Sequence, residues 1–349
     1  MGVARTLAVR AIMLLIVLYG VLLLTSTIIG ASGLSDTVLE AIVKEKVRAF
    51  KQAISARITN ETAIQQAVKK YEESLAISYG LDKPWYVRIP RMIYNIMVLD
   101  LGTSRAVQSF SGSNRIADIV MERLPNTVYL VTTAVLVSSL SGLALGLWAS
   151  LRAGKIIDRF VGLGAAISYA LPTWWLGMIL ILIFAYQLRL FPPGGMKTPG
   201  LVTDNPVVQA GDLVWHLALP LTSLYVALVG SWTYITRAII VSITKEDFVF
   251  AGMAKGLPEN IIRRRYLLRP SASPILTNMI IGLAGSIAGA ILTETVFSWP
   301  GMGSLYLSAI NAVDVNLILA LTFIYTLVYV IARFLLEVIY IIIDPRVRL

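Results

Sequence analysis

Residues 245–270, KEDFVFAGMAKGLPENIIRRRYLLRP, form a polar and basic stretch between two long apolar spans, and this stretch decides how the chain is organised. The pattern predicts two short helices separated by a break. Asp247 is a suitable cap for the first helix, and Lys255 suits the negative end of its dipole. Gly256 can adopt the left-handed conformation that ends a helix, and Pro258 can open the next helix.

The same stretch has the composition of a surface that another protein grips. Ala251, Gly252 and Ala254 give the first predicted helix almost no side chains, so a partner could approach its backbone closely. We expect the second helix to end at Pro270, because proline breaks a helix interior. Its basic residues lie toward the negative end of its dipole: Arg263, Arg264 and Arg265. The alternative is an ordinary loop whose basic residues only set membrane topology.

The composition places the rest of the chain in a membrane. Of its 349 residues, 57% are hydrophobic and 14% are charged, and the mean hydropathy is +0.75. Apolar stretches of about 20 residues, the length that spans a bilayer as a helix, recur along the chain. We therefore predict an all-α integral membrane protein with six transmembrane helices, at about Val9–Ile29, Thr127–Leu151, Val161–Leu188, Leu213–Ile235, Pro274–Val296 and Leu317–Ile343.

The distribution of basic residues predicts the orientation. With six spans both termini share one side, and the short loops of that side carry most of the lysines and arginines, including Arg5, Arg10, Arg152, Lys155, Arg159, the basic residues from Arg237 to Arg269, Arg346 and Arg348. The short loops of the other side carry only Arg189 and Lys197. The positive-inside rule then makes both termini cytoplasmic. The net charge of +10 is mostly this topology signal and does not indicate nucleic-acid binding.

The predicted domains follow from the spans. Residues 1–30 are the first span, 31–124 an external segment, and 125–349 a core of five spans with a cytoplasmic loop at 237–273. Within the external segment, residues 36–79 have apolar positions at helical spacing and dense mixed charge, which predicts two amphipathic helices. They could dock a binding protein, or they could only cover the loop. Asn60 opens a glycosylation sequon, which is a weak pattern by itself.

Catalytic patterns are nearly absent. The single histidine, His216, is expected to be structural, and with no cysteine the chain offers no cysteine-based metal site. Lys155 follows a glycine, but the other positions of a phosphate-binding loop do not match. Arg333 and Glu337 are one helical turn apart and are expected to neutralise each other. We expect no enzyme and no bound cofactor. An intramembrane enzyme would need a catalytic pair at one membrane depth, and a passive channel would need no elaborate cytoplasmic loop.

Six stretches of the chain are informative when they are taken together and in order. They are ERLPNT at 122–127, ALPTWWLG at 170–177, HLALP at 216–220, DFVFAGMAKGL at 247–257, ETVFSWPGMG at 294–303 and DPRVR at 344–348. Together they resemble the inner-membrane permease subunits of dipeptide and oligopeptide ABC importers, whose relatives also import oligosaccharides. The stretch at 247–257 is similar to the cytoplasmic signature of that family, with Phe250 where the broader importer pattern has glutamate. Residues 31–80 match nothing in the family.

The resemblance implies the type I ABC importer permease fold, carrying an external helical insertion, in the cell membrane. Its implied partners are a second homologous permease, two cytoplasmic ATPase subunits that bind ATP, and an external substrate-binding protein. Peptide is the expected cargo, and oligosaccharide is the alternative. The implied ATPase-coupling residues are Asp247, Phe250, Ala251, Gly252, Ala254, Lys255, Gly256, Arg263 and Arg264; candidates for the pathway or its gate are Pro172, Trp174, Glu294, Trp299, Pro300 and Gly301.

Overall fold

The structure is a computed structural model that describes residues 3–56 and 60–343. The described residues are helical, with one isolated bridge between Thr103 and Arg115 and no longer strand. This confirms the predicted all-α class. The predicted DPRVR match and the basic residues Arg346 and Arg348 lie outside the described residues.

The chain divides into two compact units, which are described separately. Unit 1 contains residues 1–12, 120–307 and 327–349, and unit 2 contains residues 13–119 and 308–326. The helices are α1 (Val3–Ala31), α2 (Leu34–Ser55), α3 (Glu61–Ser78), α4 (Trp85–Met97), α5 (Ile116–Thr127), η1 (Val128–Thr132), α6 (Thr133–Ser150), α7 (Ile156–Ala170), α8 (Thr173–Leu180), η2 (Ile181–Gln187), α9 (Pro206–Ile243), α10 (Asp247–Ala254), α11 (Glu259–Ile261), η3 (Ile262–Leu268), α12 (Arg269–Ser286), α13 (Ile291–Val296), α14 (Met302–Asn311) and α15 (Val315–Ile343), where η marks a π-helical segment.

Four helices of the described chain are long and apolar enough to cross a membrane, and a bent pair brings the number to five if it counts as one span. The four are Arg5–Ala31, Ile116–Ser150, Pro206–Ile243 and Val315–Tyr340. They correspond to the first, second, fourth and sixth predicted spans. The chain is therefore a membrane-spanning helical protein, and the differences from the predicted set are in the third and fifth spans.

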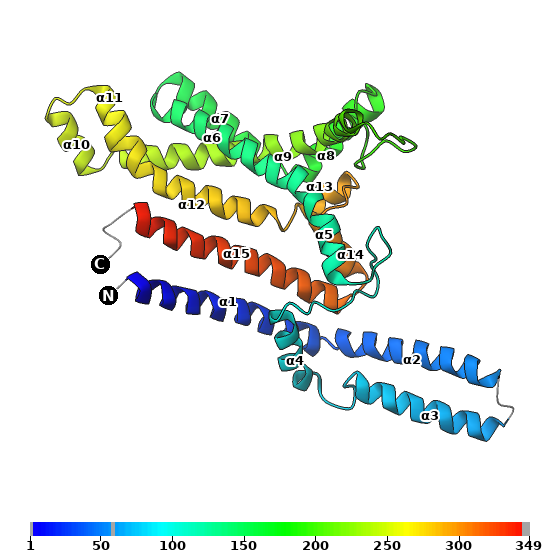
Figure 1. Cartoon of the computed structure of the whole chain (residues 1–349). Helices are drawn as coiled ribbons and strands as arrows, with labels where there is room; N and C mark the ends of the chain where they lie inside the picture. Colours follow the sequence, from blue (N-terminus) through cyan, green and yellow to red (C-terminus); the bar gives the residue numbers. More distant parts are fainter. Residues whose placement is uncertain (1–2, 57–59, 344–349) are drawn as a thin grey trace. The chain divides into compact units, whose positions relative to one another are not determined.

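The third predicted span is bent rather than straight. Helix α7 and the α8–η2 helix meet at an angle of 89° (Figure 1). Pro172 occupies the break, where its φ is −63° and its ψ is 129°. The preceding Leu171 is also extended, as is usual for a residue before proline. The apolar composition predicted the span, but the proline between two apolar runs decided its shape.

The fifth predicted span is divided as well. Helix α12 ends at Ser286, and the short α13 starts at Ile291. Gly289 lies in the gap with a φ of +82°, and a Cβ atom there would come within 2.6 Å of Glu294 Oε1. A continuous helix through this point is excluded because the chain needs both the positive φ and the close approach.

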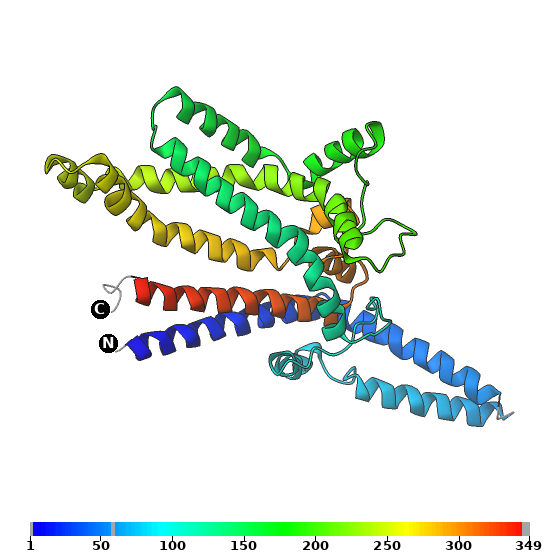
Figure 2. The same cartoon turned by 45° about the horizontal axis from the view of Figure 1, so that its top comes forward.

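Helix α9 is the central element of unit 1 and packs against α6, α7, α8 and α12. Figure 2 shows α6, in green, alongside α9. Gly142 and Gly146 of α6 face α9 directly, and a Cβ at Gly146 would come within 2.7 Å of Thr236 Cβ. Small residues allow helices to approach closely in a membrane, where packing rather than water exclusion drives association. A second close contact joins α9 to α7, where the Gly230 N–H donates to Ser168 Oγ at 3.0 Å.

Unit 2 contains the predicted amphipathic helices as an antiparallel hairpin of α2 and α3 (Figure 1). The rings of Phe50 and Tyr71 stack between them with centroids 4.3 Å apart. Lys46 Nζ donates to the Tyr79 hydroxyl at 2.7 Å, and this bond raises the pKa of Lys46. Asn60 caps α3 by accepting from the Thr62 N–H at 3.1 Å. The sequon asparagine thus has a local structural role.

Candidate functional site

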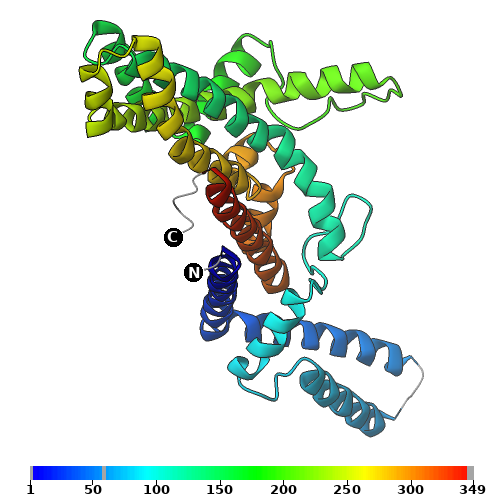
Figure 3. The same ribbon diagram turned by 60° about the vertical axis from the view of Figure 1, so that its left-hand side comes forward.

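The predicted two-helix segment forms a small folded hairpin. Helix α10 leads to Gly256, whose φ is +70°, and α11 with η3 returns after Pro258 (Figure 3). Both the left-handed glycine and the opening proline are confirmed. The inside is apolar: Val249, Ile262 and Leu267 are buried together, with Ile243, Leu257 and Tyr266 packed around them. The segment thus has a core of its own at the end of α9.

Gly252 faces this core, and not the outside as we predicted. A Cβ atom at Gly252 would come within 3.0 Å of Ile262 Cδ1 and 3.1 Å of Tyr266 Cε1. Val249 and Gly252 are three positions apart, so they lie on one face of the helix, which the hairpin must bury. The small residue serves the approach of the two helices of the hairpin to each other.

The outward face of α10 is partly apolar. The Phe250 side chain is 74% exposed and the Met253 side chain is 53% exposed. Ala251, Ala254 and Lys255 are also exposed beside them. Large apolar side chains exposed on a short helix are frequent anchors of a protein interface. Phe250 was in the predicted set, and Met253 was not.

Two details of the segment differ from prediction. Glu246 and not Asp247 occupies the N-cap position of α10, and it makes no side-chain cap hydrogen bond. Asp247 lies in the first turn, where its negative charge still interacts favourably with the positive end of the helix dipole. Pro270 does not end the second helix: η3 runs directly into α12, and Pro270 lies in the first turn of α12. Pro270 therefore lies inside a continuous helical run, directly after the π-helical segment η3, and a local π-helical adjustment of this kind accommodates a proline within a helix.

The basic residues of the segment lie on the surface. Arg263, Arg264 and Arg265 are exposed on η3, and no ion pair within the described residues involves them. Their charges are therefore available to a partner. Charged groups at the rim of an interface mainly steer association and fix its register.

An ion pair in unit 1 fastens α7 to α9, the helix that leads into the segment. Arg237 Nη2 donates to Asp158 Oδ2 at 2.8 Å and Arg237 Nε to Asp158 Oδ1 at 2.5 Å. The Gly154 N–H also donates to Asp158, at 2.9 Å. Only 4% of the Asp158 side chain is exposed. Sequence reasoning used Arg237 only as a topology signal and missed Asp158, because nothing in the sequence pairs two residues so far apart.

Glu294, a predicted pathway residue, is fully buried at the centre of a hydrogen-bond network. Its carboxylate accepts from the Ser304 N–H at 2.8 Å, the Thr127 hydroxyl at 3.1 Å and the Ala290 N–H at 3.4 Å. Thr127 Oγ1 in turn accepts from the Met302 N–H at 2.7 Å. The carboxylate thus holds together the end of α5, the start of α13 and the start of α14. We call this arrangement the Glu294 clamp.

The Glu294 clamp also includes the next stretch of the chain, Trp299, Pro300 and Gly301. Trp299 is fully buried and its indole N–H donates to the Asn126 carbonyl at 2.8 Å, while Asn126 Nδ2 donates to the Pro300 carbonyl at 2.8 Å. A Cβ atom at Gly301 would come within 2.6 Å of Glu294 Oε2. The ERLPNT and ETVFSWPGMG stretches, far apart in the sequence, therefore form one structural element.

The bend at Pro172 contacts the same region. Thr293 Oγ1 donates to Thr173 Oγ1 at 2.9 Å. A Cβ atom at Gly177 would come within 2.7 Å of Phe297 Cε2, so α8 and α13 pack closely. The Trp174 side chain is 36% exposed. The structure thus places Pro172 and its neighbours next to the Glu294 clamp.

Comparison with known proteins identifies the family. Residues 142–349 match the binding-protein-dependent transport system inner membrane component. The chain belongs to this family. The "Oligopeptide transport system permease protein AppB" of Bacillus subtilis is 28% identical over 79% of this chain and 84% of its own length. The "Probable peptide ABC transporter permease protein y4tP" of Sinorhizobium fredii is 30% identical over 84% and 89%, and the "Dipeptide transport system permease protein DppB" of Bacillus subtilis is 28% identical over 84% and 86%.

The family match covers the hairpin at residues 245–270 of this permease and most of the Glu294 clamp. His216 lies in the matched part. It is 4% exposed, and its Nδ1 lies 2.9 Å from the Asp212 carbonyl oxygen in the preceding turn of α9. Those contacts agree with the structural role expected for the histidine.

The predicted pairing of Arg333 with Glu337 is wrong. The ion pairs of the described residues do not include one between these two half-buried side chains of α15. The order of the two charges gives a reason, since an acid that follows a base by four positions is the less favourable arrangement in a helix.

Proposed function

We propose that this permease subunit moves peptides across the cell membrane in an importer whose energy comes from separate ATPase subunits. The support for the cargo is that the relatives described above are named for peptide, oligopeptide or dipeptide transport. Oligosaccharide, the alternative from the wider resemblance, has no support among them. ATP is bound by the partner subunits in this proposal, and the permease contributes conformational change rather than chemistry.

The observation that carries the coupling role is the outward face of α10. A helix with its own buried core keeps its shape when it is pressed against a partner, and Phe250 and Met253 project from it. We propose that this face sits in a groove of an ATPase subunit, with Arg263 and Arg264 at its rim. Closure of the two ATPase subunits would then move α9 and α12, the helices that flank the segment.

The full assembly in this proposal has two homologous permeases, two ATPase subunits and an external binding protein that delivers the peptide. Each permease would cross the membrane six times, with both termini cytoplasmic. In this arrangement α12, α13 and the break between them at residues 287–290 count as one span. Residues 31–124 are an external insertion before the core at 125–349. The clustering of basic residues on one set of short loops supports the orientation.

Single cysteines test the orientation, because the chain has none of its own. Lys69 on α3 and Asn260 on α11 are exposed. In intact cells a membrane-impermeant thiol reagent should label a cysteine at position 69, and it should label one at position 260 only after the membrane is opened. Labelling of position 260 from outside would reverse the orientation.

Uptake by the reconstituted importer tests the function. Proteoliposomes that contain the complete assembly should accumulate a labelled dipeptide only when ATP and the binding protein are present on their respective sides. A labelled oligosaccharide should not accumulate. Accumulation of the sugar without the peptide would contradict the proposed cargo, and uptake without ATP would contradict the proposed mechanism.

A further inference from the structure

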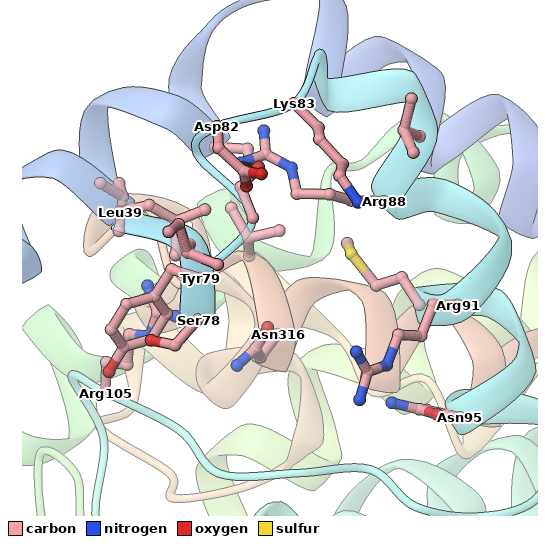
Figure 4. A pocket seen from close by; sticks show the side chains of 17 residues that line it. Leu39, Ser78, Tyr79, Asp82, Lys83, Arg88, Arg91, Asn95, Arg105 and Asn316 are labelled. Atoms are coloured by element: carbon pink, nitrogen blue, oxygen red, sulfur yellow. Dashed lines mark hydrogen bonds between the residues drawn. The ribbon is translucent and has the colours of Figure 1, made fainter. Parts of the chain in front are cut away.

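Unit 2 contains a basic cleft that the importer function does not explain. Its volume is about 520 Å³, and it lies among α2, α3, α4 and the start of α15 (Figure 4). Four of its lining side chains are basic and one, Asp82, is acidic. The four are Lys83, Arg88, Arg91 and Arg105. The volume is within the range of small-ligand sites.

One wall of the cleft is fixed by Arg88. Its guanidinium pairs with Asp36 of α2 and also donates to the Gly80 carbonyl at 3.4 Å. Gly80 has a φ of +71° and forms the turn after α3, and a Cβ there would come within 3.1 Å of Arg88 Cδ. The charge of Arg88 is thus already matched, and its role is to hold α2, α4 and the turn together.

The opposite wall is organised by Asp314, which is 2% exposed. Its carboxylate accepts from the Ser104 hydroxyl at 2.8 Å, the Arg105 N–H at 2.6 Å and the Leu317 N–H at 3.2 Å. The last bond caps the start of α15, and the first two fix the loop that carries Arg105. Asn316 lies in the same first turn and lines the cleft. The position of Arg105 is therefore set by a buried carboxylate.

Three cations of the cleft are unmatched. The side chains of Lys83, Arg91 and Arg105 make no ion pair or hydrogen bond within the described residues. Figure 4 shows Arg91 and Asn95 on one side of the cleft and Arg105 on the other, with Asn316 between them. Guanidinium groups that line two sides of one cleft can bind an oxyanion with several acceptor oxygens.

The cleft lies where two apolar helices end. Ser35, close after the end of α1, and Val315, the first residue of α15, both line it. Helix α4 carries the residues of a membrane interface: Tyr86 and Tyr94 are 59% and 65% exposed, and the Trp85 ring packs where a side chain at Gly30 would collide with it. Aromatic and basic residues on such a helix are typical of the headgroup region.

We propose that this cleft binds the phosphate group of an anionic membrane lipid. Arg91 and Arg105 hold the phosphate oxygens, Lys83 adds positive charge, and the apolar side chains of Val87 and Met92 contact the start of the acyl chains. A peptide carboxylate carries the same sign of charge, but the position at the ends of two membrane helices favours the lipid. The proposal does not depend on the cargo of the importer.

Native mass spectrometry of the purified, fully assembled importer tests the proposal. The assembly is exchanged into detergent with phosphatidylglycerol or with zwitterionic phosphatidylcholine, and retained lipid is counted. We expect wild type to retain phosphatidylglycerol in preference, and the double variant Arg91→Gln with Arg105→Gln to lose it on the order of tenfold or more. Lys70→Gln, an exposed position of α3 outside the cleft, is the matched control and should behave as wild type.

Three further arms complete the test. Arg91→Lys with Arg105→Lys should recover part of the retention, which a purely structural defect would not allow. Glycerol phosphate should compete for the site, and a free dipeptide should not. Equal retention by the glutamine variant and wild type would overturn the proposal. Arginine-dependent displacement by the dipeptide alone would also overturn it and make the cleft a substrate site.

Discussion

The helical hairpin at 245–270 and the Glu294 clamp are stabilised in opposite ways. The hairpin has a small apolar core and leaves Phe250 and Met253 exposed. The clamp buries its polar groups and satisfies them, with Glu294 and Trp299 fully enclosed. An element of the first kind can dock against a partner as a unit, whereas one of the second kind holds distant segments in a single arrangement.

The two elements also differ in what surrounds their glycines. Gly252 of the hairpin faces the ends of flexible side chains, Ile262 and Tyr266. Gly301 of the clamp faces a carboxylate that is already engaged in several hydrogen bonds. Substitution in the hairpin should therefore change docking with little effect on the transmembrane core, and substitution in the clamp should damage the core itself.

The largest effect is expected for Glu294→Leu. Removing the carboxylate leaves the buried Thr127 hydroxyl and the half-buried Ser304 N–H without this acceptor, at a cost of about 3–5 kcal/mol. Thermal unfolding of the purified permease in detergent should show a strongly lowered midpoint or no monodisperse protein. Glu337→Gln, on a half-buried carboxyl of α15, is the control and should unfold near wild type. Equal midpoints for the two variants would show that Glu294 does not hold these segments together.

Gly252→Glu should come next, and it should act inside the hairpin. The new side chain has no room between α10 and η3, so the hairpin should open and become sensitive to limited proteolysis in the isolated permease. Ala251→Glu places the same charge one residue earlier on the exposed face and should leave the hairpin resistant. Proteolysis of both variants at one rate would mean that the buried face of α10 is misassigned.

Asp158→Asn should have a smaller effect between α7 and α9. The change leaves the Arg237 guanidinium without its charged partner, and we expect a loss of about 1–3 kcal/mol in the stability of the permease. The midpoint of thermal unfolding reports it. The double variant Asp158→Asn with Arg237→Gln should recover part of the loss, because no charge is then left unmatched. Additive losses would show that the two residues act independently.

The smallest effect is expected for Gly256→Ala. The space around Gly256 is open, so only the positive φ opposes a side chain, at about 1–2 kcal/mol. Gly256→Asn should cost less, because asparagine tolerates the left-handed conformation. Uptake by proteoliposomes should fall modestly for alanine and less for asparagine. A reversed order would argue against a conformational cause.

Local patterns predicted the hairpin well and the clamp poorly. Gly256 and Pro258 act through their own backbone, so their roles could be read from the sequence. The partners of Glu294 come from segments far apart in the chain, and composition alone placed that carboxyl only near the end of a span. The effect of Pro270 was misjudged because the π-helical segment that precedes it cannot be recognised from the sequence.

The proposed docking of the outward face of α10 onto an ATPase subunit can be measured directly. Tagged permease carrying Phe250→Ala with Met253→Ala should retain the ATPase subunits at least about tenfold less than wild type in a pull-down, because exposed apolar anchors carry most of the energy of such an interface. Phe160→Ala removes a phenyl ring of similar exposure, 69%, from α7 and should retain them fully. Wild-type retention by the double variant would show that the outward face of α10 is not the docking surface.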